Sequence, residues 1–457
     1  MPATHETYAC PASVCTDLSK VSASQWNALL SPDDEDAPLL SWEFLQGLES
    51  SGCVGGSSGW FPYHLLIREN GVLVAAAPAY LKTDSSGEWV GDGEWAILSL
   101  ALRARYYPKL VLAVPWNPVT GSRLLVLPTL PSEERRRLRR LLLVSAKRVC
   151  RRAGLSSAHI LFVRGSHLPP GTNATDADAH PHPDDNALSL CQTEDFWPRR
   201  QTQYHFHNRG YAVFDDFLAD LRSHRRHSIR RERRLLAESG VTVTTHAGLH
   251  TDQDAPPDNT TPGEKPTRGF TRAELDLMFD LYVDTSIRYT GEKPFLHRSF
   301  FHLCADRLGT RIELTLARNR EGEILAGAWN LRGNRTRWGR YWGTRSTLPF
   351  LHFEVCYYHP IERCIAEGLS IFEPGHGGDH KLLRGFEPTY TYSSHFFSDP
   401  KLHQLVGRYL FHDAKWAEAI ADTEKRRCPL RQTPHPDDPN HADRPESPDR
   451  PETTDPK

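Results

Sequence analysis

The densest group of reactive side chains in this sequence lies between residues 352 and 384. Acyl transfer to an amine needs a base that deprotonates an ammonium group and a donor that stabilises the tetrahedral oxyanion. Either of two carboxylates, Glu354 and Glu373, could be that base. The competing interpretation is a structural ion-pair network that holds a loop to a helix. The members of the group are His352, Glu354, Glu373, Asp379, His380, Lys381 and Arg384.

The oxyanion donor has three candidates in the same stretch, namely His380, Lys381 and the backbone amides of Gly377 and Gly378. A cationic donor suits a developing negative charge. The order of residues does not choose among the three.

A glycine-dense loop, Pro-Gly-His-Gly-Gly-Asp at residues 374–379, follows a predicted strand. Its backbone, starting at Gly375, can present several amides to an anion, and Lys381 and Arg384 add positive charge. A tight turn that requires small residues is the other interpretation of this loop.

Two aromatic residues between glycines close a further strand, in Gly-Arg-Tyr-Trp-Gly at residues 339–343. Tyr341 could be a general acid or bind a ligand, and Trp342 could line the pocket, with His352 nearby in sequence. Such residues more often belong to a hydrophobic core.

Two predicted helices are strongly basic. Residues 222–234 contain seven arginines and two histidines against one glutamate, and residues 135–152 contain nine lysines and arginines. Such stripes can neutralise phosphates, although a solvated helix face is their commoner meaning. We expect an anionic partner for the first helix, through Arg226, Arg230 and Arg233, and a solvated face for the second.

Length and composition set the class of protein. The chain has 457 residues, 39% of them hydrophobic, and a formal net charge of -2, which indicates two or three globular domains. Its nine cysteines are scattered without a CxxC pair, so we expect reduced thiols, no metal site and no tightly bound cofactor. No apolar run is long enough to span a membrane and no secretory signal is visible, so we expect a cytoplasmic protein.

Hydrophobic periodicity predicts the elements that position these residues. In the first part of the chain we expect helices at 38–49 and 132–154 and strands at 63–68, 72–81, 110–114, 123–127 and 158–163, with an Asn70-Gly71 hairpin turn. In the second part we expect helices at 214–240, 271–290 and 353–367 and strands at 311–318, 324–331, 336–343 and 369–372. Thr271 and Glu274 predict a capping box.

This order, a helix, a three-strand meander, a helix and a strand, occurs twice and is that of a GNAT acyltransferase core. The sequence therefore predicts an α+β fold of two tandem GNAT-like lobes, each a mostly antiparallel sheet flanked by helices. The lobes cover residues 16–168 and 191–425. Segments rich in Pro, Asp and Thr predict a disordered insertion at 169–190, a mobile one at 251–268 and a disordered tail at 426–457.

A series of motifs resembles one bacterial family, the FemAB-like or peptidoglycan biosynthesis/recognition group of the GNAT superfamily. The resemblance covers about residues 40–168 and 195–415. It is carried in the first part by residues 80–88, 106–110, 115–123 and 156–162. In the second part it is carried by residues 203–211, 225–234, 339–343, 352–358, 372–375 and 380–385.

The resemblance implies two packed lobes, as in Fem-type aminoacyltransferases, and a donor that is aminoacyl-tRNA or acyl-CoA. It also suggests that Tyr107, Lys109 and Arg123 close the cleft from the first lobe. The sequence departs from the family pattern at Phe206, Pro360, His376-Gly377 and Asp379. Proline at 360 lacks an amide donor and should kink the helix or delay its start.

We therefore expect an acyl- or aminoacyltransferase that acts on an amine, and an amine of a peptidoglycan-like precursor is one candidate acceptor. Against ordinary acetyl-CoA use, the Gly-x-Gly turn that would cradle a pyrophosphate is absent after either meander, where 343–350 offers only Arg345. The alternative is a non-catalytic protein of the same fold that recognises an anionic cell-wall or nucleotide ligand. The sequence leaves the donor, the acceptor, a tRNA partner and the oligomeric state open.

Overall fold

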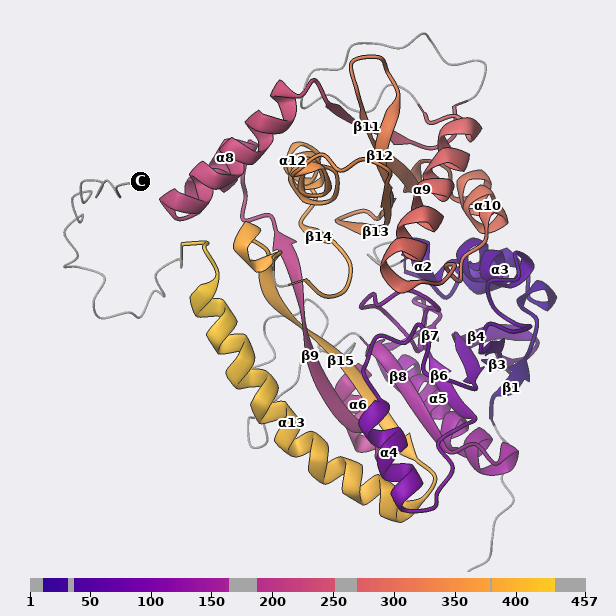
Figure 1. The fold of residues 1–457 in the computed structure, drawn as a ribbon. Coiled ribbons are helices and arrows are strands. Elements are labelled where there is room, and N and C mark those ends of the chain that lie inside the picture. Colours follow the sequence, from indigo (N-terminus) through magenta and orange to yellow (C-terminus); the bar gives the residue numbers. More distant parts are fainter. Residues whose placement is uncertain (1–10, 32–36, 164–186, 251–268, 379, 432–457) are drawn as a thin grey trace, which may run out of the picture.

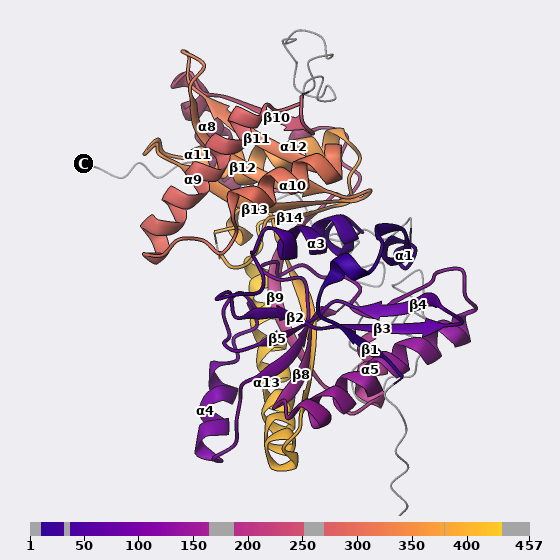
Figure 2. The same ribbon diagram turned by 90° about the vertical axis from the view of Figure 1, so that its right-hand side faces the viewer.

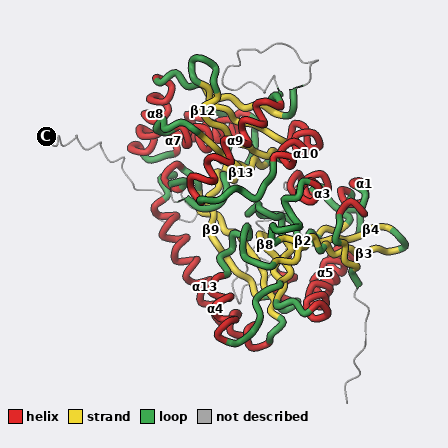
Figure 3. Tube along the Cα trace, turned by 45° about the vertical axis from the view of Figure 1, so that its right-hand side comes forward, coloured by secondary structure: helices red, strands yellow, loops and turns green. Residues whose placement is uncertain are grey.

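The structure, a computed structural model, describes residues 11–31, 37–163, 187–250, 269–378 and 380–431. Asp379, residues 251–268 and most of the predicted insertion and tail lie outside this set. Figure 1 shows the helices and strands between residues 223 and 373 above those of the first part, while the other strands and the long last helix of the second part run down beside the first part. Figure 3 shows these strands at the centre of the molecule and helices around them.

The first part of the chain contains a helical entry, two sheets and one long helix. Its strands are β1 (Ser13–Cys15), β2 (Trp60–Pro62), β3 (His64–Glu69), β4 (Val72–Ala77), β5 (Ala79–Lys82), β6 (Lys109–Leu112), β7 (Leu125–Val126) and β8 (Ser157–Val163). Its helices are α1 (Ala23–Asn27), α2 (Ala37–Leu40), α3 (Trp42–Ser50), α4 (Gly93–Ala101) and α5 (Ser132–Ala153).

The second part opens with helix α6 (Ala187–Thr193) and closes with α13 (Pro400–Arg427). Its other helices are α7 (Phe214–Asp220), α8 (Ser223–Glu238), α9 (Arg272–Thr290), α10 (Arg298–Leu308), α11 (Leu351–Phe353), α12 (His359–Ala366) and the short 3-10 turn η6 (Leu382–Arg384). Its strands are β9 (Trp197–His207), β10 (Thr242–Ala247), β11 (Ile312–Arg318), β12 (Ile324–Arg332), β13 (Thr336–Thr344), β14 (Ile371–Glu373) and β15 (Glu387–Phe397).

One eleven-stranded sheet runs through both parts, in the order β10-β11-β12-β13-β14-β9-β15-β8-β6-β5-β2, and a second sheet has the order β1-β3-β4-β7. Most pairs are antiparallel, and β13–β14 and β6–β8 are parallel. The predicted α+β class with mostly antiparallel sheets is confirmed. The large sheet is continuous because β9 and β15 pair with each other from His205 to Trp197. Strand β9 also pairs with β14, and β15 also pairs with β8.

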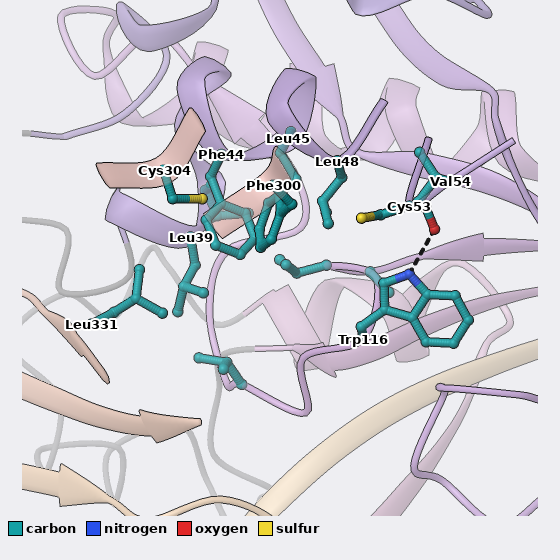
Figure 4. Close-up of a cluster of buried hydrophobic side chains, with 14 of the residues drawn as sticks. Leu39, Phe44, Leu45, Leu48, Cys53, Val54, Trp116, Phe300, Cys304 and Leu331 are labelled. Carbon is teal, nitrogen blue, oxygen red and sulfur yellow. Dashed lines mark hydrogen bonds between the residues drawn. The ribbon is translucent and has the colours of Figure 1, made fainter. Parts of the chain in front are cut away.

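The two parts also share a hydrophobic core. Helix α3 packs its buried face, with Phe44 and Leu48, against Phe300 and Cys304 of α10 (Figure 4). The rings of Phe44 and Phe300 meet edge to face at 5.3 Å. Helix α3 lies beside α10 in Figure 2 as well, although about 250 residues separate them. The sheet and this core bind the two parts into one unit.

Local signals place several elements correctly. Asn70 and Gly71 both have positive φ, 49° and 82°, as the predicted hairpin turn between β3 and β4 requires. Thr271 and Glu274 form the predicted capping box at the start of α9. The predicted strand 72–81 is instead two strands, because Pro78 separates β4, which belongs to the smaller sheet, from β5, which belongs to the larger one.

The helix that carries the 352–358 motif changes its winding before Pro360. Residues Glu354–Tyr358 form a π turn, in which the His359 amide donates to the Glu354 carbonyl. Proline cannot donate an amide hydrogen bond, and the wider turn accommodates this loss, so α12 begins at His359. The predicted disturbance at Pro360 is confirmed as a π turn.

Three predicted boundaries are wrong. The predicted helix 214–240 is broken between α7 and α8, because Leu221 is extended and bridges Leu430. The predicted insertion at 169–190 ends earlier, since α6 begins at Ala187. The predicted tail starts later, since α13 continues to Arg427 and Cys428 and Leu430 are buried.

Candidate active site

A cavity opens where two parallel strands part. Strand β14 pairs with β13 only at Thr336↔Ile371, Arg337↔Phe372 and Trp338↔Glu373, after which β13 continues to Thr344 and β14 ends. The loop after β14 leaves this pairing, although Pro374 and Gly375 still lie next to Gly339 of β13. The space between them has a volume of about 250 Å³ and is bordered by residues 339–342 of β13, the loop at 374–378, and Cys356 and Tyr357 of the π turn.

The described side chains that line this cavity include no carboxylate. Those that can ionise are Arg340, Tyr341, His352, Cys356, Tyr357, His376, His380 and Lys381. A site with this composition favours a ligand that carries carbonyl, carboxylate or phosphate oxygens.

Lys381 is the one lysine of the cavity lining and is 3% exposed. Its Nζ donates to the Gly375 carbonyl at 2.6 Å and to the His376 carbonyl at 3.4 Å, so it ties the glycine loop to the start of η6. Burial and, to a smaller extent, the charge of Arg340 lower the pKa of Lys381 to about 7. Neutral and protonated forms of this amine are therefore both populated near neutral pH.

Arg340 reaches the cavity through a β-bulge. Tyr341 pairs with Trp329 and Gly339 with Asn330, so Arg340 has no opposite residue on β12. A bulge redirects a side chain and increases the local twist. The Arg340 guanidinium donates to the Gly339 carbonyl at 2.9 Å and lies 3.4 Å from the Glu373 carboxylate. Burial lowers the pKa of Arg340.

Aromatic rings form the opposite side of the cavity. The His352 ring lies 4.7 Å from that of Trp342 and 5.1 Å from that of Tyr357. Burial lowers the pKa of His352 to about 4, so this ring is neutral at pH 7. The Tyr357 hydroxyl and His380 Nε2 share a hydrogen bond of 2.8 Å.

The first part of the chain reaches the rim of the cavity at Trp89. Its ring lies 5.8 Å from that of His376, and burial lowers the pKa of this histidine. Trp89 itself has φ 63° and is 46% exposed, so it offers a free aromatic face beside the cavity. This contact was not predicted from the sequence.

The sequence matches the FemAB-like family, described as peptidoglycan biosynthesis/recognition, over residues 17–258 and 263–432. The chain belongs to the FemAB-like family. No curated protein matches it significantly. The expected family is confirmed, and with it a broad role in peptidoglycan biosynthesis or recognition.

Among solved structures, this FemAB-like chain is similar to FemX, at 12% identity and a TM-score of 0.47, over 85% of this chain and 98% of that one. It is similar to the C-terminal domain of a putative lysylphosphatidylglycerol synthetase from Agrobacterium fabrum, at 10% identity and a TM-score of 0.45, over 86% and 95%. It is also similar to a tandem GNAT protein from the clavulanic acid biosynthesis pathway, at 12% identity and a TM-score of 0.37, over 85% of this chain and 98% of that one.

Glu354, a candidate base, does not line the cavity of this FemAB-like protein. Its carboxylate accepts three hydrogen bonds of 2.9–3.1 Å from Arg233 of α8, and burial raises its pKa while Arg233 opposes that rise. Glu354 and Lys381 are therefore not brought together as the sequence suggested. Glu373, the other candidate, does not line the cavity either, and its carboxylate lies 3.4 Å from Arg340.

The glycine loop has a backbone that requires small residues, as the tight-turn interpretation proposed. Gly375, Gly377 and Gly378 have φ of 91°, 71° and 92°, in the left-handed region that favours glycine. Arg384 is displaced from the cavity, because its guanidinium stacks 3.3 Å above the Phe353 ring and donates to the His380 carbonyl at 3.0 Å.

The basic helix α8 divides its arginines between internal and exposed roles. Arg233 is internal, since it also donates to Glu362 at 2.7 Å. Arg230 pairs with the exposed Asp215 at 2.9 Å, and Arg226 contacts only the Ala219 carbonyl at 3.5 Å in the described structure. Arg230 is exposed and Arg226 is partly buried, so these two arginines differ from the internal Arg233.

Three residues expected to close the cleft from the first part of the chain lie elsewhere. Lys109 is buried between Glu88 and Asp92, at 2.9 and 2.5 Å. Arg123 is buried and donates to the Leu161 carbonyl at 2.9 Å, and the Tyr107 hydroxyl bonds to Ser85. Each therefore makes contacts within its own part of the chain.

The residues that sequence reasoning missed are Arg340, Cys356 and Tyr357. All three belong to motifs that had been singled out, at 339–343 and 352–358, but the β-bulge and the π turn decide which members face the cavity. Among the described residues no group of His, Cys, Asp and Glu could hold a metal ion, and no described helix is long and apolar enough to cross a membrane.

Proposed function

We propose that this FemAB-like protein is an N-acyl- or aminoacyltransferase. It would move an acyl group from acyl-CoA or aminoacyl-tRNA to an amine, and the reaction would take place in the cavity beside β13. The observation that carries the proposal is Lys381, a buried amine with a pKa of about 7 in a cavity whose described lining has no carboxylate. A group that titrates near the working pH is well suited to general acid–base catalysis.

In this proposal neutral Lys381 takes a proton from the ammonium group of the acceptor. The free amine attacks the carbonyl carbon of the donor, and a C–N bond forms. The positive charges of Lys381 and Arg340 stabilise the oxyanion that results. The C–S bond of a thioester or the C–O bond of an aminoacyl ester then breaks, and protonated Lys381 returns its proton to the leaving group. The second proton of the attacking nitrogen passes to water, so the product is a neutral amide. Lysine is neutral again at the end of the cycle.

The surrounding residues have supporting roles in this proposal. Tyr341 stays protonated because burial raises its pKa, so its hydroxyl can donate a hydrogen bond to the leaving group. The edge of β13 beyond Trp338 is not paired with β14, and it can bind an extended amide of the substrate. His352, Trp342 and Tyr357 supply an aromatic wall.

The acceptor class follows from the family description. An amine of a peptidoglycan-like precursor would enter past Trp89 and His376 at the rim. Two arginines of α8, the exposed Arg230 and the partly buried Arg226, would contact phosphates of the donor.

The experiment is a turnover assay with two panels of donors, acyl-CoA thioesters and charged total tRNA, and with amine acceptors that include peptidoglycan stem peptides. Turnover should rise as the pH is raised through about 7, and Lys381→Met should lower it at least ~10²-fold. Lys293→Met removes an exposed lysine and should leave turnover unchanged. Tight binding of a donor without product in the wild-type protein would support the non-catalytic alternative and reject the proposal.

A further inference from the structure

Helices α4 and α13 expose large apolar side chains. Of these, Ile97 and Leu100 of α4 are 70% and 78% exposed, and Trp416 of α13 is 71% exposed. Phe411 and Ile420 of α13 are 55% and 45% exposed. In Figure 1 helix α13 runs along the outer edge of the molecule, outside β9 and β15, and α4 lies beside its N-terminal end; the two helices are in contact.

The exposed apolar residues of α13 are not those that hold it to the protein. Its inner face buries Leu402, Val406 and Leu410, which pack in one cluster with Trp95 and Phe397. At 100° per residue, Phe411 and Trp416 lie on the outer half of the helix. The helix is thus apolar on both sides, and only one of these sides has a partner among the described residues.

Positive charge dominates the outer half of α13. Asp413 and Glu418 lie 3.2 and 3.5 Å from Arg199 and Arg200 of β9. Glu424 accepts a hydrogen bond of 2.6 Å from Tyr204, also on β9. At 100° per residue, the exposed Lys401, Arg408, Lys415 and Arg426 lie on the outer half with Phe411, and the exposed Asp422 lies among them.

We infer that this outer half of α13, with the tip of α4, binds the surface of an anionic lipid bilayer. We call it the α13 face and define it by Leu405, Arg408, Phe411, Lys415 and Trp416. A helix that presents aromatic and aliphatic side chains together with lysine and arginine lies in the plane of a membrane interface, where the rings enter the headgroup region and the cations meet lipid phosphates. Long basic side chains can keep their charges in water while their stems cover apolar surface.

The other occupants fit less well. A second copy of the chain would place this face, which carries Arg408 and Lys415, against an identical face, and the like net charge of the two faces opposes association. Residues 432–457, which follow α13 after a short connection, contain no Leu, Ile, Val, Met or aromatic residue, so they have nothing to bury against Phe411 and Trp416. The inference does not depend on the proposed function, because no residue of the α13 face lines the cavity.

The test is flotation of the full-length protein with two kinds of vesicle, phosphatidylcholine alone and an equal mixture of phosphatidylcholine and phosphatidylglycerol. The protein should float with the mixed vesicles, and at least about 10-fold less with phosphatidylcholine. Phe411→Ser with Trp416→Ser, and separately Arg408→Glu with Lys415→Glu, should each lower binding at least about 10-fold. Circular dichroism should show both variants folded.

The matched control is Ile287→Ser with Tyr289→Ser, which removes two exposed apolar side chains from α9 and should leave binding unchanged. Equal loss in this control, or no binding of the wild-type protein to the mixed vesicles, would overturn the inference. Light scattering that shows a dimer dispersed by the Phe411 and Trp416 changes would overturn it in favour of self-association. Binding to immobilised heparin but not to vesicles would assign the face to soluble polyanions instead.

Discussion

Arg233 of α8 holds both carboxylate oxygens of Glu354, which is the first residue of the π turn beside the cavity. The same guanidinium donates to Glu362 and lies 4.6 Å from the centre of the Phe214 ring. One side chain therefore connects α7, α8 and the helix that carries Cys356 and Tyr357. The Arg233–Glu354 pair therefore holds in place the π turn that carries Cys356 and Tyr357, although neither member of the pair lines the cavity.

Glu354→Gln should therefore lower stability more than it lowers turnover. The pair is mostly buried, but the Arg233 side chain is 27% exposed, so a loss of roughly 2 kcal/mol is expected, between the values for exposed and for buried pairs. Urea denaturation measures it. Arg230→Ala, which breaks the exposed pair with Asp215, should change the free energy of unfolding by less than about 0.5 kcal/mol. A loss of turnover near ~10²-fold with unchanged stability would restore Glu354 as a candidate base.

Lys381 predicts a pH dependence of stability. The pKa of a lysine in an unfolded chain is about 10.4, whereas the pKa of Lys381 in the folded protein is about 7. Between these values the unfolded chain holds more protons, so the free energy of unfolding should rise with pH. Lys381→Met should flatten this rise in denaturation curves measured from pH 7 to 9, and Lys293→Met should not. Equal slopes in wild type and Lys381→Met would show that Lys381 keeps an ordinary pKa.

Arg337 of β13 forms a fully buried ion pair with Glu313 of β11, with contacts of 2.8 and 3.0 Å, and each side chain is 1% exposed. Arg337→Met leaves a buried carboxylate without its main partner and should cost about 3–5 kcal/mol. The double change with Glu313→Leu should recover part of this loss. Arg335→Met, at an exposed position of the same hairpin, serves as the control in chemical denaturation. A loss below about 1 kcal/mol would contradict the burial of this pair.

Gly343 allows α9 to lie directly on β13. A Cβ atom at this position would come within 2.1 Å of the Leu281 backbone, which cannot yield as a flexible side chain would. Gly343→Ala should therefore lower the free energy of unfolding by at least about 1–3 kcal/mol. Gly93→Ala, where a Cβ meets nothing within 4 Å, should be neutral or slightly stabilising in the same thermal melts. Equal melting temperatures for both variants would contradict this packing.

The elements with strong local signals could be predicted from the sequence. The Asn70-Gly71 turn, the Thr271 capping box and the Gly154 end of α5 depend on residues within a few positions of each other, so the chain around them is enough to specify them. The glycines of the loop at 374–378 likewise indicate a tight turn, and all three of them have the positive φ that such turns use. The family, too, could be recognised from motifs of a few residues each.

Strands β9 and β15 and helix α13 escaped prediction for a physical reason. Residues 197–207 and 387–397 are rich in Arg, Gln, Thr, Tyr and His and lack the apolar alternation that identifies a strand with one solvent face. Their polar side chains find partners across the sheet and on α13, as Arg199 does with Asp413. Because the partners of β9 are about 180 to 220 residues away, no local window contains them.

The sequence by itself determined which residues could do chemistry, and it placed them in a few short motifs. Only the tertiary structure decided which of them share a cavity. Glu354 and Tyr357 lie within one turn of the same helix, yet only Tyr357 lines the cavity together with Lys381. The Glu354 carboxylate is bonded instead to Arg233, which is 121 residues earlier in the sequence. The direction of a side chain depends on where its partners lie in space, and that is set by how β13, β14 and α8 pack rather than by spacing along the chain.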